Sequence, residues 1–285
     1  FGKPYGITVL KNKLYVTDTA FGVVFVIDTV TGKTSFLGDK NKGKLSQPVG
    51  IAIDNNENVY VTDSKAQRLF GYDKKGKMIF VLGNDDEFIR PTGLAINRDL
   101  EIMYVVDTKG HTIRAFALNG DFLFDIGERG SEDGEFNFPT NIAVDQNSGN
   151  VVVVDTQNFR VQIFDQDGNH IKTFGNIGDV PGTFARPKGV AVDSDGNIYI
   201  SDAAFDNIQI FDKTGEQLLM YFGKAGVNPG EFQQPTGLSF DEFDRLHVTE
   251  NFAGKVQIFQ YLSDKWKKEH PEEYKELMDS RRVEE

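Results

Sequence analysis

Residues 139–175 read PTNIAVDQNSGNVVVVDTQNFRVQIFDQDGNHIKTFG, and this stretch decides the fold. It contains four short segments rich in β-branched and aromatic residues, at 141–145, 150–155, 160–165 and 171–175. Apolar and polar residues alternate along them, and turn residues such as Asp167-Gly168 separate them, which is typical of antiparallel strands. No helical segment lies between them to carry the crossover that parallel strands need. The stretch therefore predicts one sheet of four antiparallel strands.

The same unit recurs six times along the chain. Its first anchor is a proline with glycine two residues later, except that Asn141 replaces the glycine once; the prolines are Pro4, Pro48, Pro91, Pro139, Pro187 and Pro235. Its second anchor is an acid 14 to 16 residues after each proline: Asp18, Asp63, Asp107, Asp155, Asp202 and Glu250. One such sheet cannot bury both faces, whereas six sheets around an axis can. We therefore predict an all-β, six-bladed β-propeller of four-stranded antiparallel blades over residues 1–262. A short, charged helical tail follows over residues 263–285.

Composition excludes several classes of protein. The 285 residues include no cysteine, so a disulfide framework or a thiolate metal site is impossible. The net charge of −12 disfavours binding to nucleic acid. No run of eighteen apolar residues is present, so we expect no transmembrane segment in this chain. The chain begins at Phe1 in the middle of a repeat, and we expect a further segment upstream.

Several stretches resemble a known family. Residues 187–193, 198–202, 160–165 and 174–175 resemble the successive strands of the NHL repeat, and the resemblance covers residues 1–262. Residues 138–141, 184–189 and 256–262 further resemble a group of exported bacterial six-bladed propellers, often lipoproteins and often encoded near multihaem cytochromes. The resemblance implies an extracytoplasmic location in the periplasm, the outer membrane or at the cell surface. It also implies a protein partner, such as a multihaem c-type cytochrome.

The six repeated acids allow two interpretations, a cation site or a structural role. Each acid ends the second strand of its unit, directly before a turn. Its side chain can accept hydrogen bonds from the backbone N–H groups of that turn. A residue that every blade contains is more simply one that builds the blade. We therefore predict that the six acids are structural.

The loops between the second and third strands hold the candidate partner contacts. Four phenylalanines fall there without repeating in register, and His111 and Asp206 lie in equivalent loops. Loop aromatics without a core role are candidate binding residues, although capping of the sheets explains them equally well. The candidate contacts are Phe21, His111, Phe159, Phe205, Asp206 and Phe252.

These features favour a non-catalytic scaffold that binds a partner protein through its loop face. The alternative is an enzyme, a metal-dependent lactonase or lyase of the propeller type. The four histidines do not fall at equivalent positions, and no Pro-x-Gly segment carries an acid as its central residue. The sequence therefore predicts no metal, no cofactor and no catalytic residue.

The sixth unit lacks its fourth strand, because the charged tail follows its third strand. Phe1-Gly2 is too close to Pro4 to supply that strand, since two residues span only about 7 Å. We therefore expect residues upstream of Phe1, or another chain, to cover the open edge at residues 255–262.

Overall fold

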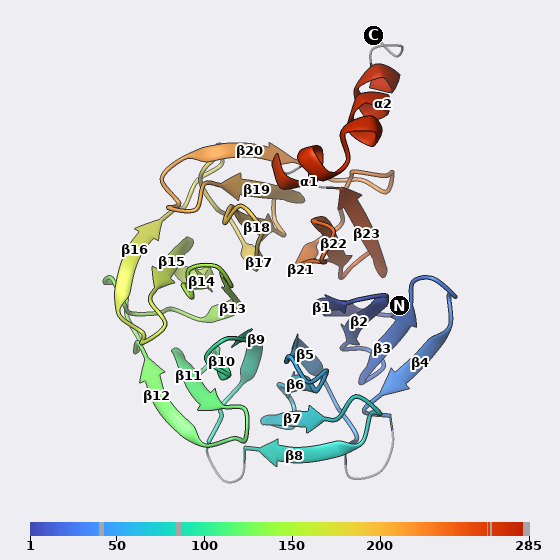
Figure 1. Cartoon of the computed structure of the whole chain (residues 1–285). Coiled ribbons are helices and arrows are strands. Elements are labelled where there is room, and N and C mark those ends of the chain that lie inside the picture. The colour runs from blue at the N-terminus through green and yellow to red at the C-terminus, as the bar shows by residue number, and fades with distance from the viewer. Residues whose placement is uncertain (40–42, 84–86, 261, 263, 282–285) are drawn as a thin grey trace.

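The structure is a computed structural model, and it describes residues 1–39, 43–83, 87–260, 262 and 264–281. Seen along its axis, six antiparallel sheets surround a central channel, with β1, β5, β9, β13, β17 and β21 innermost (Figure 1). Five sheets have four strands, and the sixth has three among the described residues. The predicted six-bladed propeller is thus confirmed.

The first three blades are β1 (Pro4–Leu10), β2 (Lys13–Asp18), β3 (Val23–Asp28) and β4 (Thr34–Leu37); β5 (Pro48–Ile53), β6 (Val59–Asp63), β7 (Arg68–Tyr72) and β8 (Met78–Leu82); and β9 (Pro91–Asn97), β10 (Ile102–Asp107), β11 (Thr112–Ala117) and β12 (Phe122–Ile126). The last three are β13 (Pro139–Val144), β14 (Val151–Asp155), β15 (Arg160–Phe164) and β16 (His170–Phe174); β17 (Pro187–Val192), β18 (Ile198–Asp202), β19 (Asn207–Phe211) and β20 (Leu218–Phe222); and β21 (Pro235–Phe240), β22 (Arg245–Glu250) and β23 (Lys255–Gln260). A short 3-10 helix, η2 (Thr156–Asn158), follows β14.

The spacing of the two anchors follows from strand register. In every blade the proline that begins the first strand lies opposite the acid that ends the second, as Pro187 lies opposite Asp202. The register shifts just after each proline, so a bulge bends the inner strand where it reaches the channel. The repeat is therefore one hairpin with a fixed bulge.

Hydroxyl groups join neighbouring blades around the channel. The Ser201 hydroxyl accepts the Gly189 N–H at 2.8 Å and donates to the Thr236 carbonyl of the next blade, also at 2.8 Å. A side chain at Gly189 is excluded, because a Cβ there would lie 1.8 Å from that carbonyl oxygen. An equivalent hydroxyl-to-carbonyl hydrogen bond joins the last blade to the first: the Thr249 hydroxyl donates to the Tyr5 carbonyl at 2.6 Å. These contacts bring the inner strands of blades six and one together.

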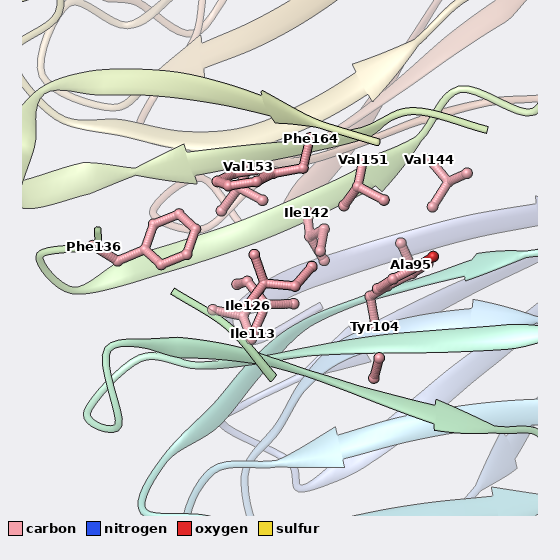
Figure 2. Packing of buried hydrophobic residues seen from close by; sticks show 12 residues of the cluster. Ala95, Tyr104, Ile113, Ile126, Phe136, Ile142, Val144, Val151, Val153 and Phe164 are labelled. Atoms are coloured by element: carbon pink, nitrogen blue, oxygen red, sulfur yellow. The ribbon is translucent and has the colours of Figure 1, made fainter. Parts of the chain in front are cut away.

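The hydrophobic core lies between blades rather than inside one. In Figure 2, Ile113 and Ile126 of the third blade face Ile142 and Val153 of the fourth. Phe136, from the connection between these blades, is fully buried in the same cluster. Each blade thus buries both faces only against its neighbours, as the sequence predicts.

The chain ends in two short helices, α1 (Asp264–Glu269) and α2 (Pro271–Arg281), which confirm the predicted helical tail. Trp266 on α1 is 6% exposed and stacks on His270 with ring centroids 5.0 Å apart. Among the described residues, neither helix combines the length and the hydrophobicity that a membrane span requires.

Candidate active site

The repeated acids are buried at the end of their blades where the Pro-x-Gly segments lie, and they accept hydrogen bonds from backbone N–H groups. Asp202 is fully buried and accepts from Ala185, Arg186, Ala204 and Phe205. The other members of the set are also at most 2% exposed: Asp18, Asp63, Asp107, Asp155 and Glu250. In the first five blades the carboxylate ties the segment before the blade to the loop after the second strand. In the sixth, Glu250 accepts the Gln233 N–H and a Gln257 side-chain N–H on β23.

In the fourth blade the acid also binds a cation. Arg160 Nε lies 2.9 Å from Asp155 Oδ2, and its other nitrogens donate to three carbonyls of the connection. Burial raises the pKa of Asp155, against the hydrogen bonds from Asn137, Asn158 and Arg160. This ion pair holds the connection in place. Because all three guanidinium nitrogens of Arg160 already have partners, the pair does not offer a ligand site.

The candidate contact residues lie in loops of five different blades. Phe21 and Phe252 are 63% and 73% exposed, whereas Phe159 and Phe205 are half-buried. Among the described residues, no aromatic contact joins any two of these four phenylalanines. Asp206 Oδ1 accepts the Gln234 N–H at 2.6 Å.

His111 is buried, in contrast to the two exposed phenylalanines. Its Nδ1 lies 3.2 Å from the Phe136 carbonyl and 3.3 Å from the Phe138 N–H. Its ring meets the Phe138 ring edge-on, with centroids 4.4 Å apart. This position leaves little of His111 for a partner to contact.

A ring of six aliphatic side chains divides the central channel into two cavities. Each blade contributes the residue three positions after its proline: Ile7, Ile51, Leu94, Ile142, Val190 and Leu238. All six are at most 7% exposed and line both a cavity of about 180 Å³ on one side and one of about 50 Å³ on the other. The smaller cavity opens among the Pro-x-Gly segments and is also lined by Tyr5, Thr140 and Asn141.

Cations recur at three sets of equivalent positions in the repeats: the residue before each proline, the central residue of each Pro-x-Gly segment, and the second residue after each acid. These cations are Lys3, Lys65, Arg90, Lys109, Arg186 and Lys188, and the eighteen positions hold no acid. The described lining of the smaller cavity includes none of the six. The whole chain has 43 acidic and 31 basic residues, so these positions differ in charge from the chain as a whole.

Two titratable side chains at the mouth are perturbed in opposite senses. Burial raises the pKa of Tyr5, although the charge of Arg90 opposes the shift. Burial lowers the pKa of Lys188, and the charges of Arg186 and Arg90 lower it further, against Asp202. Tyr5 and Lys188 are the central residues of the Pro-x-Gly segments of blades one and five, and Arg90 directly precedes the first strand of blade three. A phenol that keeps its proton and an amine that readily loses one form an acid–base pair.

The residues at this mouth do not fit a metal ion. In the described part of the chain, no three carboxylates or imidazoles are grouped so that they could hold one. The repeated acids are bound to backbone N–H groups, and the cations that recur in the repeats repel a divalent ion. The metal dependence expected for the alternative function therefore finds no support in these side chains.

Comparison with known proteins bears on family and function. The family description of the NHL repeat matches residues 45–72, 136–164 and 184–211, which lie in the second, fourth and fifth blades. The chain carries NHL repeats. This NHL propeller is 27% identical over 131 residues to the probable peptidyl-alpha-hydroxyglycine alpha-amidating lyase pgal-1 of Caenorhabditis elegans. The match covers 41% of the chain but only 37% of that relative.

Solved structures share the fold of this NHL propeller. Virginiamycin B lyase from Staphylococcus aureus superposes with a TM-score of 0.65 at 15% identity, covering 92% of this chain and 86% of that one. Hydrazine synthase from Kuenenia stuttgartiensis superposes with a TM-score of 0.65 at 12% identity, covering 92% and 97%. At these identities the likeness shows the fold alone.

The comparisons correct the expected function. We predicted a non-catalytic scaffold without catalytic residues, but the curated relative is a probable lyase. The prediction of a non-enzyme is therefore wrong, and an enzyme propeller is the better interpretation. The cell-envelope location and the multihaem cytochrome partner stay predictions from the resemblance.

Proposed function

We propose that this chain is a lyase whose active site is the mouth of the small cavity, with Lys188 as general base and Tyr5 as general acid. The observation that carries the proposal is that Tyr5 lines this cavity and Lys188 occupies the equivalent position at the start of inner strand β17. Burial raises the pKa of Tyr5 and lowers that of Lys188. Acid–base pairs of this kind contribute about 10²–10⁴-fold to the rate of a reaction. The relationship to a curated lyase supplies the reaction class.

The reaction of the named relative suggests the first substrate to test, a peptide that ends in α-hydroxyglycine. In such a compound one carbon bears a hydroxyl, an amide nitrogen and a carboxylate. The Lys188 amine takes the hydroxyl proton, the oxygen–carbon double bond forms, and the carbon–nitrogen bond breaks. The Tyr5 phenol protonates the departing nitrogen, which gives an amide and glyoxylate. A proton then returns from Lys188 to Tyr5.

Release of glyoxylate from α-hydroxyhippurate tests the proposal. We expect turnover by the wild-type protein, and a fall in kcat of about 10²-fold or more for Tyr5→Phe and for Lys188→Met. Lys213→Met, in an exposed turn on the opposite face, is the matched control and should keep full activity. Glyoxylate release no faster than in buffer, or undiminished release by both variants, would refute the proposed function.

A further inference from the structure

The larger channel cavity lies across the aliphatic ring from the Pro-x-Gly segments. Its volume is about 180 Å³, and the residue that follows each member of the aliphatic ring lines it. These six residues are all small: Thr8, Ala52, Ala95, Ala143, Ala191 and Ser239. An apolar cavity of about 150 Å³ is large enough to hold benzene. This end of the channel therefore has room for a compact organic molecule, and the aliphatic ring forms its floor.

Arg98 is the one charged residue in the described lining of this cavity. It directly follows β9, so it lies at the rim, at the end of the channel away from the Pro-x-Gly segments. Its backbone N–H donates to Gln146 Oε1 at 3.2 Å, and its Nε donates to the Ile53 carbonyl at 3.4 Å. The other two guanidinium nitrogens have no acceptor among the described residues. The side chain is thus held at the cavity with two donor nitrogens free.

Among the residues that the structure describes, no carboxylate lies within ion-pair distance of Arg98. Burial lowers the pKa of Arg98, and the charge of Asp54 opposes this shift. The oxygens of Asp54 are already used, because they accept the Asn56 and Asn58 N–H groups and the Tyr60 hydroxyl. The acids at the ends of other inner strands likewise bind N–H groups of their own turns: Asp145, Asp193 and Asp241. A half-buried guanidinium without a counter-charge favours an anionic ligand.

A second polar group in the wall of this cavity also lacks a partner. Thr8 is 9% exposed and lines the cavity, and its hydroxyl makes no hydrogen bond to a described residue. Thr8 comes from blade one and Arg98 from blade three, so the two polar groups belong to different sides of the channel. Sites for small organic molecules combine an apolar lining with a few such polar groups.

We propose that this end of the channel binds a small organic carboxylate, with its apolar body toward the aliphatic ring and its carboxylate against Arg98. The two free guanidinium nitrogens suit the two oxygens of a carboxylate, which pair with them through parallel N–H···O bonds. One guanidinium also balances the single charge of a carboxylate, whereas a phosphate monoester carries about −1.5 to −2. Because the aliphatic ring separates this site from Tyr5, the proposal goes beyond the proposed function and does not depend on it.

Titration calorimetry with benzoate, benzamide and benzylammonium tests the charge preference of the site. We expect benzoate to bind at least tenfold more tightly than either of the other probes, and more weakly as salt increases. Arg98→Gln should weaken benzoate binding at least tenfold, because the amide cannot supply a charged pair of donors. Arg68→Gln removes an exposed arginine at the other end of the propeller, so this matched control should bind benzoate like the wild type.

Methyl NMR of the wild-type protein locates the bound probe. Benzoate should shift the δ1-methyl signals of Ile53 and Ile96, which line this cavity but not the smaller one. Ile79, on the outermost strand of its blade and 48% exposed, should keep its signal in place. If Arg98→Gln does not fold, the order of the three affinities and these shifts still decide the question. Absence of benzoate binding, equal or tighter binding of benzamide or benzylammonium, undiminished binding by folded Arg98→Gln, or shifts confined to other residues would overturn the proposal.

Discussion

Replacing Asp202 by alanine should destabilise the protein and also disturb the mouth. The carboxylate is fully buried and accepts four N–H groups, from Ala185 at 2.8 Å, Arg186 at 3.1 Å, Ala204 at 2.9 Å and Phe205 at 3.3 Å. A buried donor left without an acceptor costs about 1–3 kcal/mol. Arg186 and Ala204 are exposed, so water can replace part of the loss, and we expect about 2–4 kcal/mol in total.

Asp63 provides the matched control for this prediction. It accepts hydrogen bonds from the equivalent four N–H groups, of Ser46, Gln47, Lys65 and Ala66, but lies three blades from Lys188 in either direction around the ring. Both alanine variants should lower the melting temperature by about 5–15 °C. Asp202→Ala alone should also lower the pKa of Lys188, because Asp202 favours the charged amine, and so shift the pH dependence of glyoxylate release toward acid. Thermal unfolding by circular dichroism and glyoxylate release at several pH values measure the two effects. An unchanged melting temperature for Asp202→Ala, or an equal pH shift in Asp63→Ala, would refute this reasoning.

Three further predictions concern single groups. Lys188→Met should stabilise the protein by about 1 kcal/mol at pH 7, because a lowered pKa means that the fold disfavours the charged amine, and this gain should vanish above pH of about 10.4. Burial lowers the pKa of His247, so the free energy of unfolding should fall as the pH drops below about 6.5, and His247→Gln should remove this dependence in urea unfolding. Slow amide exchange across β23 would reveal a strand paired with its open edge, as expected from the sequence, whereas fast exchange would contradict that expectation.

The fold was predictable because its signal is repeated. Each proline and each acid occurs in six copies, and the register that pairs Pro187 with Asp202 is encoded in their spacing. The sequence did not predict the hydroxyl contacts between blades, because the hydroxyl residue does not occupy the same position in every repeat. Ser201 and Thr249 precede their acids, but in the third and fourth blades Thr108 and Thr156 follow theirs and donate to Pro139 and Pro187.

The candidate active site was not predictable from local patterns. Tyr5 and Lys188 are central residues of Pro-x-Gly segments, a position where an acid would indicate a metal site. Because none of the six segments carries an acid there, the sequence predicted no enzyme. The same positions attract attention only because burial in the folded ring shifts their pKa values, together with the charge of Arg90, which lies 85 residues after Tyr5 in sequence. Proximity across three blades depends on closure of the ring, which no single repeat contains.

The most direct test of the central claim is a crystal structure of Lys188→Met with α-hydroxyhippurate bound. The account predicts the amide nitrogen beside the Tyr5 hydroxyl and the substrate hydroxyl directed toward position 188. Substrate bound at the opposite end of the channel or on the outer loops, with an empty mouth, would contradict the account.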